Sequence, residues 1–257
     1  MMDIFLLGTG TAIPTKQHSP AGLIVIADGQ RVLLDIGPGT LTRLDLAGIT
    51  YDQLDHILLT HLHPDHTLDL ATLFQVISSA PNATLPPVTP RTKPLLITGC
   101  LGTQEFIQRM LKLYPDITPL TYELQVRQVY RDEFSIGKLK VQSAPTGHTP
   151  ESVAYRLDDS GHSMVYSGDA THSGELVRLA DGADLLICEC SFPAGWETED
   201  HLNADTVGMI AQQAGVKSLV GVHFYPPALA VDLIGQIRSH YAGKVQLAID
   251  GLHLSLN

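Results

Sequence analysis

The chain has 257 residues, of which 44% are hydrophobic, and carries a net charge of −11 from 16 Lys and Arg against 27 Asp and Glu. This acidic balance disfavours a protein that grips long nucleic acids, because such proteins usually present a basic stripe to the phosphates. The sequence has no apolar run of the roughly 18 residues that a membrane span needs, no basic leader and no linker-like break, so we expect one domain over residues 1–257, in the cytoplasm and without membrane contact.

The amino-terminal segment is predicted to be a strand followed by a β-hairpin. Hydrophobic patterns indicate strands over Asp3 to Leu7, Gly22 to Ala27 and Arg31 to Ile36, and the last two are joined at Asp28-Gly29, a strong hairpin signal. The loop Gly8-Thr9-Gly10-Thr11 lacks the spacing and the Lys of a phosphate-binding loop. We therefore expect a tight turn near the functional site.

A helix through Leu46 is expected after Asp35-Ile36-Gly37-Pro38-Gly39. Asp35 ends the preceding strand, and its carboxylate has two interpretations. It can simply cap the helix, or it can orient a metal-ligating imidazole from outside the ligand shell. The sequence leaves both open.

The stretch Thr60-His61-Leu62-His63-Pro64-Asp65-His66 carries the strongest functional signal. It follows an apolar run, Leu54 to Leu59, that predicts a buried strand, and it precedes a helical pattern that starts near Thr67. The two imidazoles of a His-x-His pair point the same way from an extended backbone. Neutral imidazole and carboxylate are ligands that Zn²⁺ or Mn²⁺ takes. Three imidazoles and a carboxylate within six residues therefore predict a metal site.

The rest of the chain alternates between strands and helices around a β-rich middle. The proline-rich segment Ala80 to Pro94 is predicted to be irregular, as either a connector or a loop over the site. Strands are predicted over Leu95 to Thr98, Leu139 to Ala144, Val153 to Leu157, Ser163 to Ser167, Leu185 to Glu189 and Ser218 to His223. Helices are predicted over Gln104 to Leu113, Ala204 to Ala214 with Asn203 as its cap, and Ala228 to Tyr241. Two such halves indicate two facing sheets with helices outside and one site along their shared edge.

Three residues in the second half match the first cluster in their placement at strand ends. His148, Asp169 and His223 each follow a predicted strand and stand among small residues. Singly, each would more often be structural than a ligand, but together they complete the predicted metal site. A carboxylate such as Asp169 can bridge two cations about 3.5 to 4 Å apart.

The three cysteines are predicted to be reduced packing residues. Cys188 and Cys190 lie on one face of a predicted strand, where they are poorly placed for a structural bridge, and Cys100 is left without a partner.

The order His61-x-His63-x-Asp65-His66, His148, Asp169, His223 resembles the metallo-β-lactamase superfamily of hydrolases. The stretch Leu7-Gly8-Thr9-Gly10-Thr11-Ala12-Ile13-Pro14, the Asp35-x-Gly37-Pro38-Gly39 segment and His201 are most similar to the ribonuclease Z branch and its small-molecule phosphodiesterase relatives. The resemblance covers nearly the whole chain and implies an α/β fold, an αββα sandwich with two divalent metal ions, usually zinc and sometimes manganese. It assigns His61, His63 and His148 to one ion, Asp65, His66 and His223 to the other, and Asp169 to both.

The same branch pairs a Glu at a strand end with a His in the following loop, which matches Glu189 and His201. A carboxylate that ends an apolar strand needs a partner, and a nearby His would be held in one tautomer and kept partly protonated. The resemblance implies Asp65, Glu189 and His201 as catalytic residues, with His201 as the proton donor to the leaving oxygen. The alternative is a structural Glu and His that never meet.

The implied activity is hydrolysis of a small anionic or ester substrate, foremost a small or cyclic phosphodiester. The two ions would lower the pKa of a bridging water from about 15.7 towards neutrality. Ribonuclease Z carries a long tRNA-binding arm between the positions of His148 and Asp169, whereas only a short hairpin, Val153 to Ser167, fills that interval here. tRNA 3′ processing is therefore the alternative, and lactone, thioester and aryl-sulfate hydrolysis stay open because they would use the same activated water.

The loop Ser191 to Asp200 precedes His201 and contains Phe192 and the only tryptophan, Trp196. Two interpretations are open. The loop lines the substrate pocket, or Trp196 packs against the core or against a second subunit of a homodimer.

Overall fold

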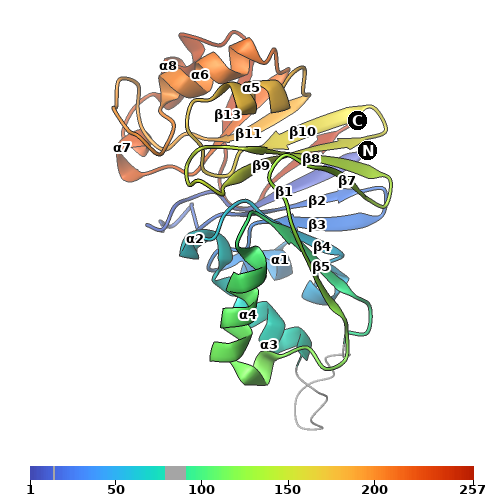
Figure 1. The fold of residues 1–257 in the computed structure, drawn as a ribbon. Coiled ribbons are helices and arrows are strands. Elements are labelled where there is room, and N and C mark those ends of the chain that lie inside the picture. Colours follow the sequence, from blue (N-terminus) through green and yellow to red (C-terminus); the bar gives the residue numbers. More distant parts are fainter. Residues whose placement is uncertain (14, 79–90) are drawn as a thin grey trace.

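Two seven-stranded sheets lie face to face in the computed structural model, which describes residues 1–13, 15–78 and 91–257 (Figure 1). The order of the first sheet is β14 (Leu252–Leu256), β1 (Met2–Gly8), β2 (Gly22–Ala27), β3 (Gln30–Leu34), β4 (His56–Leu59), β5 (Leu95–Gly99) and β6 (Leu124–Gln128). The order of the second is β13 (Lys244–Leu247), β12 (Ser218–Val222), β11 (Leu185–Glu189), β10 (His162–Tyr166), β9 (Val153–Asp159), β8 (Leu139–Pro145) and β7 (Glu133–Ile136).

Both sheets change from antiparallel to parallel pairing across their width. The antiparallel parts are β14 to β3 in the first sheet and β7 to β10 in the second. The parallel parts are β3 to β6 and β10 to β13. The central strands β4 and β11 are buried at every residue, as expected for parallel strands that are covered on both faces.

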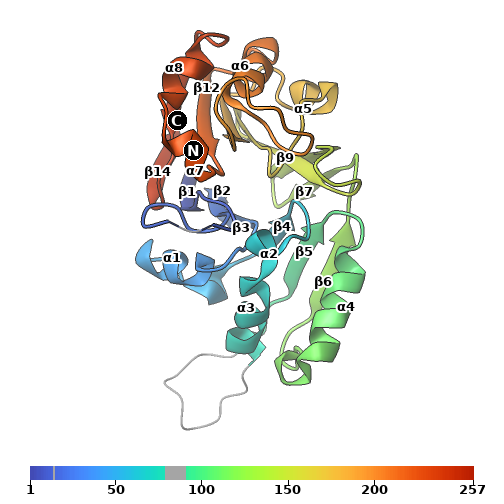
Figure 2. The ribbon, with the colours of Figure 1, turned by 90° about the vertical axis from the view of Figure 1, so that its left-hand side faces the viewer.

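Helices cover the outer faces of both sheets. The first sheet packs against α1 (Thr40–Leu46), α3 (Asp69–Ser78) and α4 (Thr103–Leu113), and the second packs against α5 (Gly174–Leu179), α6 (Ala204–Gln213) and α8 (Leu233–Arg238) (Figures 1 and 2). Short 3₁₀ helices lie at Tyr51–Gln53 and Pro115–Ile117. The short helices α2 (Pro64–Thr67) and α7 (Pro226–Leu229) stand at one edge of the sandwich, which faces the viewer in Figure 2. Apolar side chains fill three layers: between the sheets, and under each set of helices.

The predicted αββα sandwich is confirmed, but some elements differ from the sequence-based prediction. The expected helix Ala228 to Tyr241 is wrong: it is two short helices, because the Asp232 side chain accepts a hydrogen bond from the N–H of Gly235 and caps a new helix there. The strands expected to reach Ile36 and His223 end at Leu34 and Val222, since Asp35 and His223 have φ of 56° and 59°. The strands β6, β7, β13 and β14 were not identified from the sequence.

Three smaller predictions have clear outcomes. All three cysteines are buried and free, as expected. The proline-rich prediction falls largely on residues 80–90, which lie outside the described residues, and residues 91–94 are without helix or strand. In the described part of the chain, no helix has the length and apolar character needed to cross a bilayer.

Candidate metal centre

All seven predicted ligands lie just after the carboxyl ends of strands, at the edge that carries α2 and α7. Four of them follow β4, namely His61, His63, Asp65 and His66. The other three follow strands of the second sheet: His148 follows β8, Asp169 follows β10 and His223 follows β12. The potential ligand atoms form two sets, and within each set they lie within 4.8 Å of one another. The first set is His61, His63, His148 and Asp169, and the second is Asp65, His66 and His223. Crevices at the carboxyl ends of parallel strands are common places for ligand sites in α/β sheets.

Close backbone packing gathers the ligand loops. Pro64 begins α2, and this helical turn places Asp65 and His66 next to the extended His63. Gly37 packs so tightly against the turn that a Cβ there would lie 2.0 Å from the carbonyl oxygen of Asp65. Gly168, from the second sheet, approaches Thr60 of the first, where a Cβ would lie 2.6 Å from the Thr60 Cβ. Only glycine permits these approaches.

The carboxylate of Asp169 stands between two pairs of imidazoles. Its Oδ2 lies 3.7 Å from Nε2 of His61 and 3.6 Å from Nε2 of His148. Its Oδ1 lies 3.3 Å from Nε2 of both His66 and His223. Each carboxylate oxygen therefore faces a different pair of nitrogens.

Several of the buried polar atoms at this point have no hydrogen-bond partner. They are Nε2 of His61, Nε2 of His66, Nε2 of His223 and Oδ1 of Asp169. A buried polar atom without a partner costs free energy, and a cluster of such atoms aimed at one space is the arrangement that a cation would satisfy. Imidazole nitrogen and carboxylate oxygen are donors that Zn²⁺ and Mn²⁺ accept, so the side chains fit the implied metal. The chain thus has a metal-binding site.

The site opens to solvent on one side. His63 is exposed, whereas His61, His66, Asp169 and His223 are buried. Nδ1 of His63 lies 3.1 Å from Nε2 of His148, so these two side chains form the rim of the buried cluster. A substrate can reach the cluster from the His63 side.

The charge states of His61 and Asp169 suit cation binding. Burial, together with the nearby His66, holds the pKa of His61 well below its usual value, so this imidazole is neutral and keeps a free electron pair. Burial alone would raise the pKa of Asp169, but the facing imidazoles of His223 and His66 outweigh it and hold that pKa well below its usual range.

Asp35 orients a ligand rather than capping a helix, which answers the question that the sequence left open. Its Oδ2 lies 2.7 Å from Nδ1 of His66, and the same carboxylate accepts hydrogen bonds from the Thr60 N–H, the Thr60 hydroxyl and the Tyr166 hydroxyl. The helix α1 has Gly39 at its N-cap, without a side-chain cap. Fixing Nδ1 of His66 aims its Nε2 at the cluster.

His223 is held by residues that sequence reasoning missed. Its backbone N–H donates to the carbonyl of Thr9 at 2.7 Å, and its Nδ1 lies 3.1 Å from the hydroxyl of Ser191. The segment Gly8-Thr9-Gly10-Thr11 therefore lies near the site, as expected, but it is not a tight turn, because Gly8 ends β1 and Gly10 forms an isolated bridge with Phe224. His223 has a φ of 59°, an unusual conformation for a non-glycine residue that is often found at functional sites. No spacing rule singles out Ser191, although it stands two residues after Glu189.

Glu189 and His201 meet, as predicted. Nδ1 of His201 lies 3.2 Å from both carboxylate oxygens of Glu189, and Glu189 also accepts hydrogen bonds from the N–H groups of Ala170 and Leu202. The His201 ring lies 4.8 Å from that of His148 and 5.5 Å from that of His223, between centroids. Burial would lower the pKa of His201, but the hydrogen bond and charge of Glu189 raise it to about 9.

Three aromatic rings form a stack beside His201. The Phe192 ring stacks on Trp196 at 5.1 Å and on Tyr225 at 5.2 Å, with interplanar angles of 5° and 1°. Tyr225 contacts the rings of His201 and His223. Of the two interpretations offered for this loop, the structure places its aromatic residues next to the candidate centre, with Trp196 partly exposed at the outer end of the stack.

Between His148 and Asp169 the chain holds only the hairpin of β9 and β10, among residues that are all described. An arm like the one expected of a tRNA-processing enzyme is absent from this interval.

Comparisons with known proteins agree with this arrangement. A family model described as anti-Pycsar protein Apyc1 matches residues 2–218. Ribonuclease Z of Mycobacterium avium (strain 104) is 30% identical, covering 98% of this chain and 97% of its own. Among solved structures, the metallo-β-lactamase fold protein YhfI from Bacillus subtilis has a TM-score of 0.83 at 23% identity, with 98% of each chain covered. Human tRNase Z, short form (ELAC1), has a TM-score of 0.79 at 24% identity, with 99% of each chain covered.

Proposed function

Since this chain belongs to the family of the anti-Pycsar protein Apyc1 and to the ribonuclease Z-like, metal-dependent hydrolases of the metallo-β-lactamase superfamily, we propose that it hydrolyses small or cyclic phosphodiesters with two divalent metal ions. The proposal rests on the position of the Asp169 carboxylate, whose two oxygens face two different pairs of imidazoles. A pair of cations suits an in-line displacement at phosphorus, because it can stabilise both the attacking and the leaving oxygen.

The ligand assignment follows the two oxygens. His61, His63 and His148 with Oδ2 of Asp169 would hold one ion, and Asp65, His66 and His223 with Oδ1 would hold the other. Zinc is the first choice for these donors and manganese the second. When bound, the ions supply Lewis acidity at the phosphoryl oxygens and a water of lowered pKa.

Asp65 faces the second of these positions. Its Oδ2 lies 3.6 Å from Nε2 of His223 and 3.8 Å from Nε2 of His66. Burial would raise the pKa of Asp65, but the nearby imidazoles of His223 and His66 lower it, so Asp65 is a carboxylate at neutral pH. We assign it a second role beside ligation: its other oxygen accepts a hydrogen bond from the attacking water and orients it.

His201 is the proposed proton donor. Glu189 holds its Nδ1, which leaves Nε2 as the nitrogen that can face a substrate. With its pKa raised to about 9 by Glu189 against the effect of burial, the imidazole is protonated at neutral pH. In the proposed reaction, the attacking water gives one proton to solvent and its oxygen bonds to phosphorus. The bond from phosphorus to the leaving oxygen breaks, and that oxygen takes the proton of His201, which His201 then regains from solvent.

Small substrates are favoured over long nucleic acids. The net charge is −11, and only a short hairpin stands between His148 and Asp169. Endonucleolytic cleavage of RNA is the second candidate, because the relative at 30% identity is named ribonuclease Z.

One set of measurements on the purified protein tests the proposal. Elemental analysis should find about two equivalents of zinc or manganese per chain. Turnover should be high on bis(p-nitrophenyl) phosphate and on a cyclic phosphodiester, and low on an aryl sulfate, an acyl lactone and a precursor tRNA. Turnover confined to the lactone or the sulfate would overturn the proposal, and efficient 3′ processing of the tRNA would favour the second candidate.

A further inference from the structure

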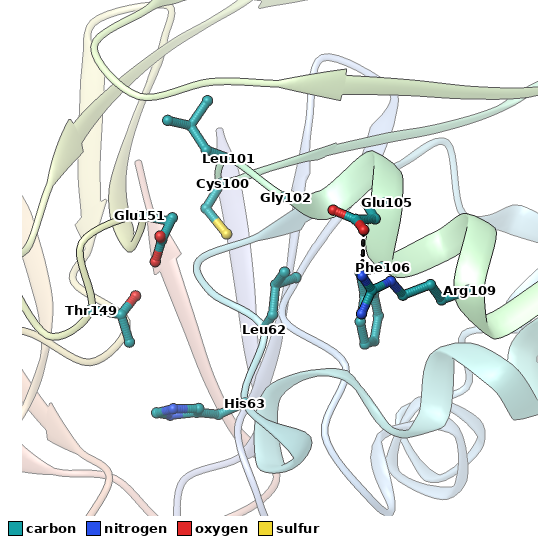
Figure 3. Close-up of a pocket in the computed structure, with 10 residues that line it drawn as sticks. All are labelled: Leu62, His63, Cys100, Leu101, Gly102, Glu105, Phe106, Arg109, Thr149 and Glu151. Atoms are coloured by element: carbon teal, nitrogen blue, oxygen red, sulfur yellow. Dashed lines mark hydrogen bonds and ion pairs between the residues drawn. The ribbon is translucent and has the colours of Figure 1, made fainter.

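A cavity of about 560 Å³ opens next to the candidate centre at His63 (Figure 3). Leu62, Leu101 and Phe106 provide its apolar wall. Its polar groups come from two sides: Thr149 and Glu151 from the loop after β8, and Glu105 and Arg109 from α4. The cavity is large enough for a substituent of several heavy atoms, and none of these residues has a role in the proposed chemistry.

His148 lies next to both the cavity-lining His63 and the proposed proton donor His201. The ring of His148 lies 5.0 Å from that of His63, which lines the cavity, and 4.8 Å from that of His201. A phosphodiester has two ester groups, of which one leaves and one stays on phosphorus. The leaving oxygen must face His201, and the group that stays on phosphorus can extend past His63 into the adjacent cavity.

The residues that line the cavity carry more negative than positive charge. On α4, Arg109 is paired with Glu105 one helical turn before it, so these two largely cancel (Figure 3). Across the cavity, the carboxylate of Glu151 has neither an ion pair nor a hydrogen bond within the described part of the chain, and it is exposed to solvent. The cavity therefore presents one uncompensated negative charge.

The turn that carries Glu151 is rigid. The buried Ser152 accepts a hydrogen bond from the N–H of Thr149 and is hydrogen-bonded to the Thr146 hydroxyl at 2.7 Å. The next residue, Val153, donates its N–H to the carbonyl of Thr60, directly before the ligand His61. The backbone at Glu151 is thus anchored relative to the centre, which keeps its carboxylate within side-chain reach of the cavity.

We infer that this cavity binds the ester substituent that remains on phosphorus, and that Glu151 makes it select a cationic or hydrogen-bond-donating substituent over an anionic one. The inference rests on the proposed phosphodiesterase function. A second phosphate or a carboxylate on the substituent would meet the Glu151 charge, whereas an ammonium group would pair with it. Glu151 is here a specificity-determining residue, not a catalytic one.

Two diesters that share one leaving group test this inference. The p-nitrophenyl ester of phosphocholine carries a quaternary ammonium, and the p-nitrophenyl ester of neohexyl phosphate carries its uncharged isostere. Because the leaving group is the same, any change in the ratio of their kcat/KM values reports on the retained substituent. The wild-type protein should prefer the choline ester.

The variants should change this ratio mainly through KM. Glu151→Gln should lower the preference roughly 3-fold and Glu151→Lys about 10-fold or more, in line with a solvent-exposed ion pair that is removed and then reversed. The wild-type preference should also fall as salt is added. Glu133→Lys is the matched control, because it makes the same charge reversal on the exposed edge strand β7 and should leave the ratio unchanged.

Each outcome has a distinct meaning. If both diesters are hydrolysed and the Glu151 variants, shown to be folded by circular dichroism, keep the wild-type ratio, the assignment of this cavity is wrong while the proposed function stands. If a chain loaded with metal hydrolyses neither diester, the proposed function itself fails.

Discussion

Oδ2 of Asp35 and Nδ1 of His66 lie 2.7 Å apart in the interior of the sandwich, and the Tyr166 hydroxyl from the second sheet donates to the same carboxylate. Asp35 is fully buried and has a φ of 56°. A buried carboxylate in a strained backbone, surrounded by donors from both sheets, is suited to hold His66 in one tautomer and one orientation.

Replacing Asp35 with Asn should therefore weaken metal binding by about 10- to 100-fold, because Asn tolerates a positive φ but is uncharged and holds the imidazole less firmly. Competition with a chelator would measure this change. Asp69→Asn is the control: this half-buried carboxylate accepts hydrogen bonds from the N–H groups of Gly39 and Leu41 rather than holding a ligand imidazole, so its loss should lower stability without weakening metal binding. Equal metal affinity in wild type and Asp35→Asn would contradict the role given to Asp35.

The two proposed ion positions should be separable by mutation. His148→Ala removes a ligand of one position only, so the bound metal should fall from about two equivalents to about one. Asp169→Ala removes the shared ligand and should lower occupancy at both positions. Elemental analysis after gel filtration gives the count for each variant. A wild-type chain that binds a single equivalent under saturating zinc would rule out the paired arrangement.

The effect of His201→Ala should depend on the leaving group. On a diester with a poor alkoxide leaving group, turnover should fall by roughly 10²- to 10⁴-fold, because the departing oxygen loses its proton donor. On a p-nitrophenyl ester the loss should be much smaller, since p-nitrophenolate leaves without a proton. Metal content should not change. His162→Ala, at the far end of β10 from Asp169, is the control and should behave as wild type with both esters. A loss of the same size on both esters would argue for a structural role.

Removing the metal should abolish hydrolysis of every ester, because each depends on the same activated water. Dialysis against a chelator, followed by addition of zinc or manganese, should remove and then restore turnover. Thermal unfolding should move to lower temperature in the metal-free protein, since a ligand that binds only the folded state stabilises it. Full activity in the presence of excess chelator would exclude a metal-dependent reaction.

His56 should make the fold sensitive to acid. It is buried in β4 with Nε2 2.7 Å from the Thr98 hydroxyl, and burial lowers its pKa to about 4, so the folded state takes up this proton less readily than the unfolded state. Stability from this group is present above the unfolded pKa of about 6.5 and is lost as the pH falls towards about 4.

Between pH 7 and pH 5 the loss attributable to His56 is on the order of 2 kcal/mol. The free energy of unfolding should be measured with urea at both pH values, in wild type and in His56→Gln. The difference between the two proteins isolates the contribution of His56, because Gln at this position can keep a hydrogen bond to Thr98 but does not titrate. The variant should lose less stability than wild type over the interval. Identical losses in both proteins would show that His56 does not titrate as argued.

The sequence predicted the cluster of His and Asp side chains at the sheet edge better than it predicted the limits of the fold. His61, His63, Asp65 and His66 are recognisable because imidazoles and a carboxylate spaced so closely after an apolar strand are typical of a metal site. The edge strands β6, β13 and β14 were missed because each has only four or five residues and is only partly buried, so its alternation of apolar and polar residues is too short to stand out.

The supporting residues show where sequence reasoning ends. Ser191 and Tyr166 reach His223 and Asp35 through contacts between residues that are 32 and 131 positions apart. No periodicity connects such pairs, so only the folded arrangement reveals them. The cavity beside His63 likewise lies between the loop after β8, which is a strand of the second sheet, and α4, which packs against the first sheet.

The first sheet supplies His61, His63, Asp65 and His66, while His148, Asp169 and His223 come from the second. Any cation shared by these residues is a cross-link between the two halves of the sandwich. The described chain has no disulfide, since its three cysteines are free and buried. Metal coordination can therefore link the two sheets without a disulfide. Loss of the proposed ions would remove this link and allow one sheet to shift against the other.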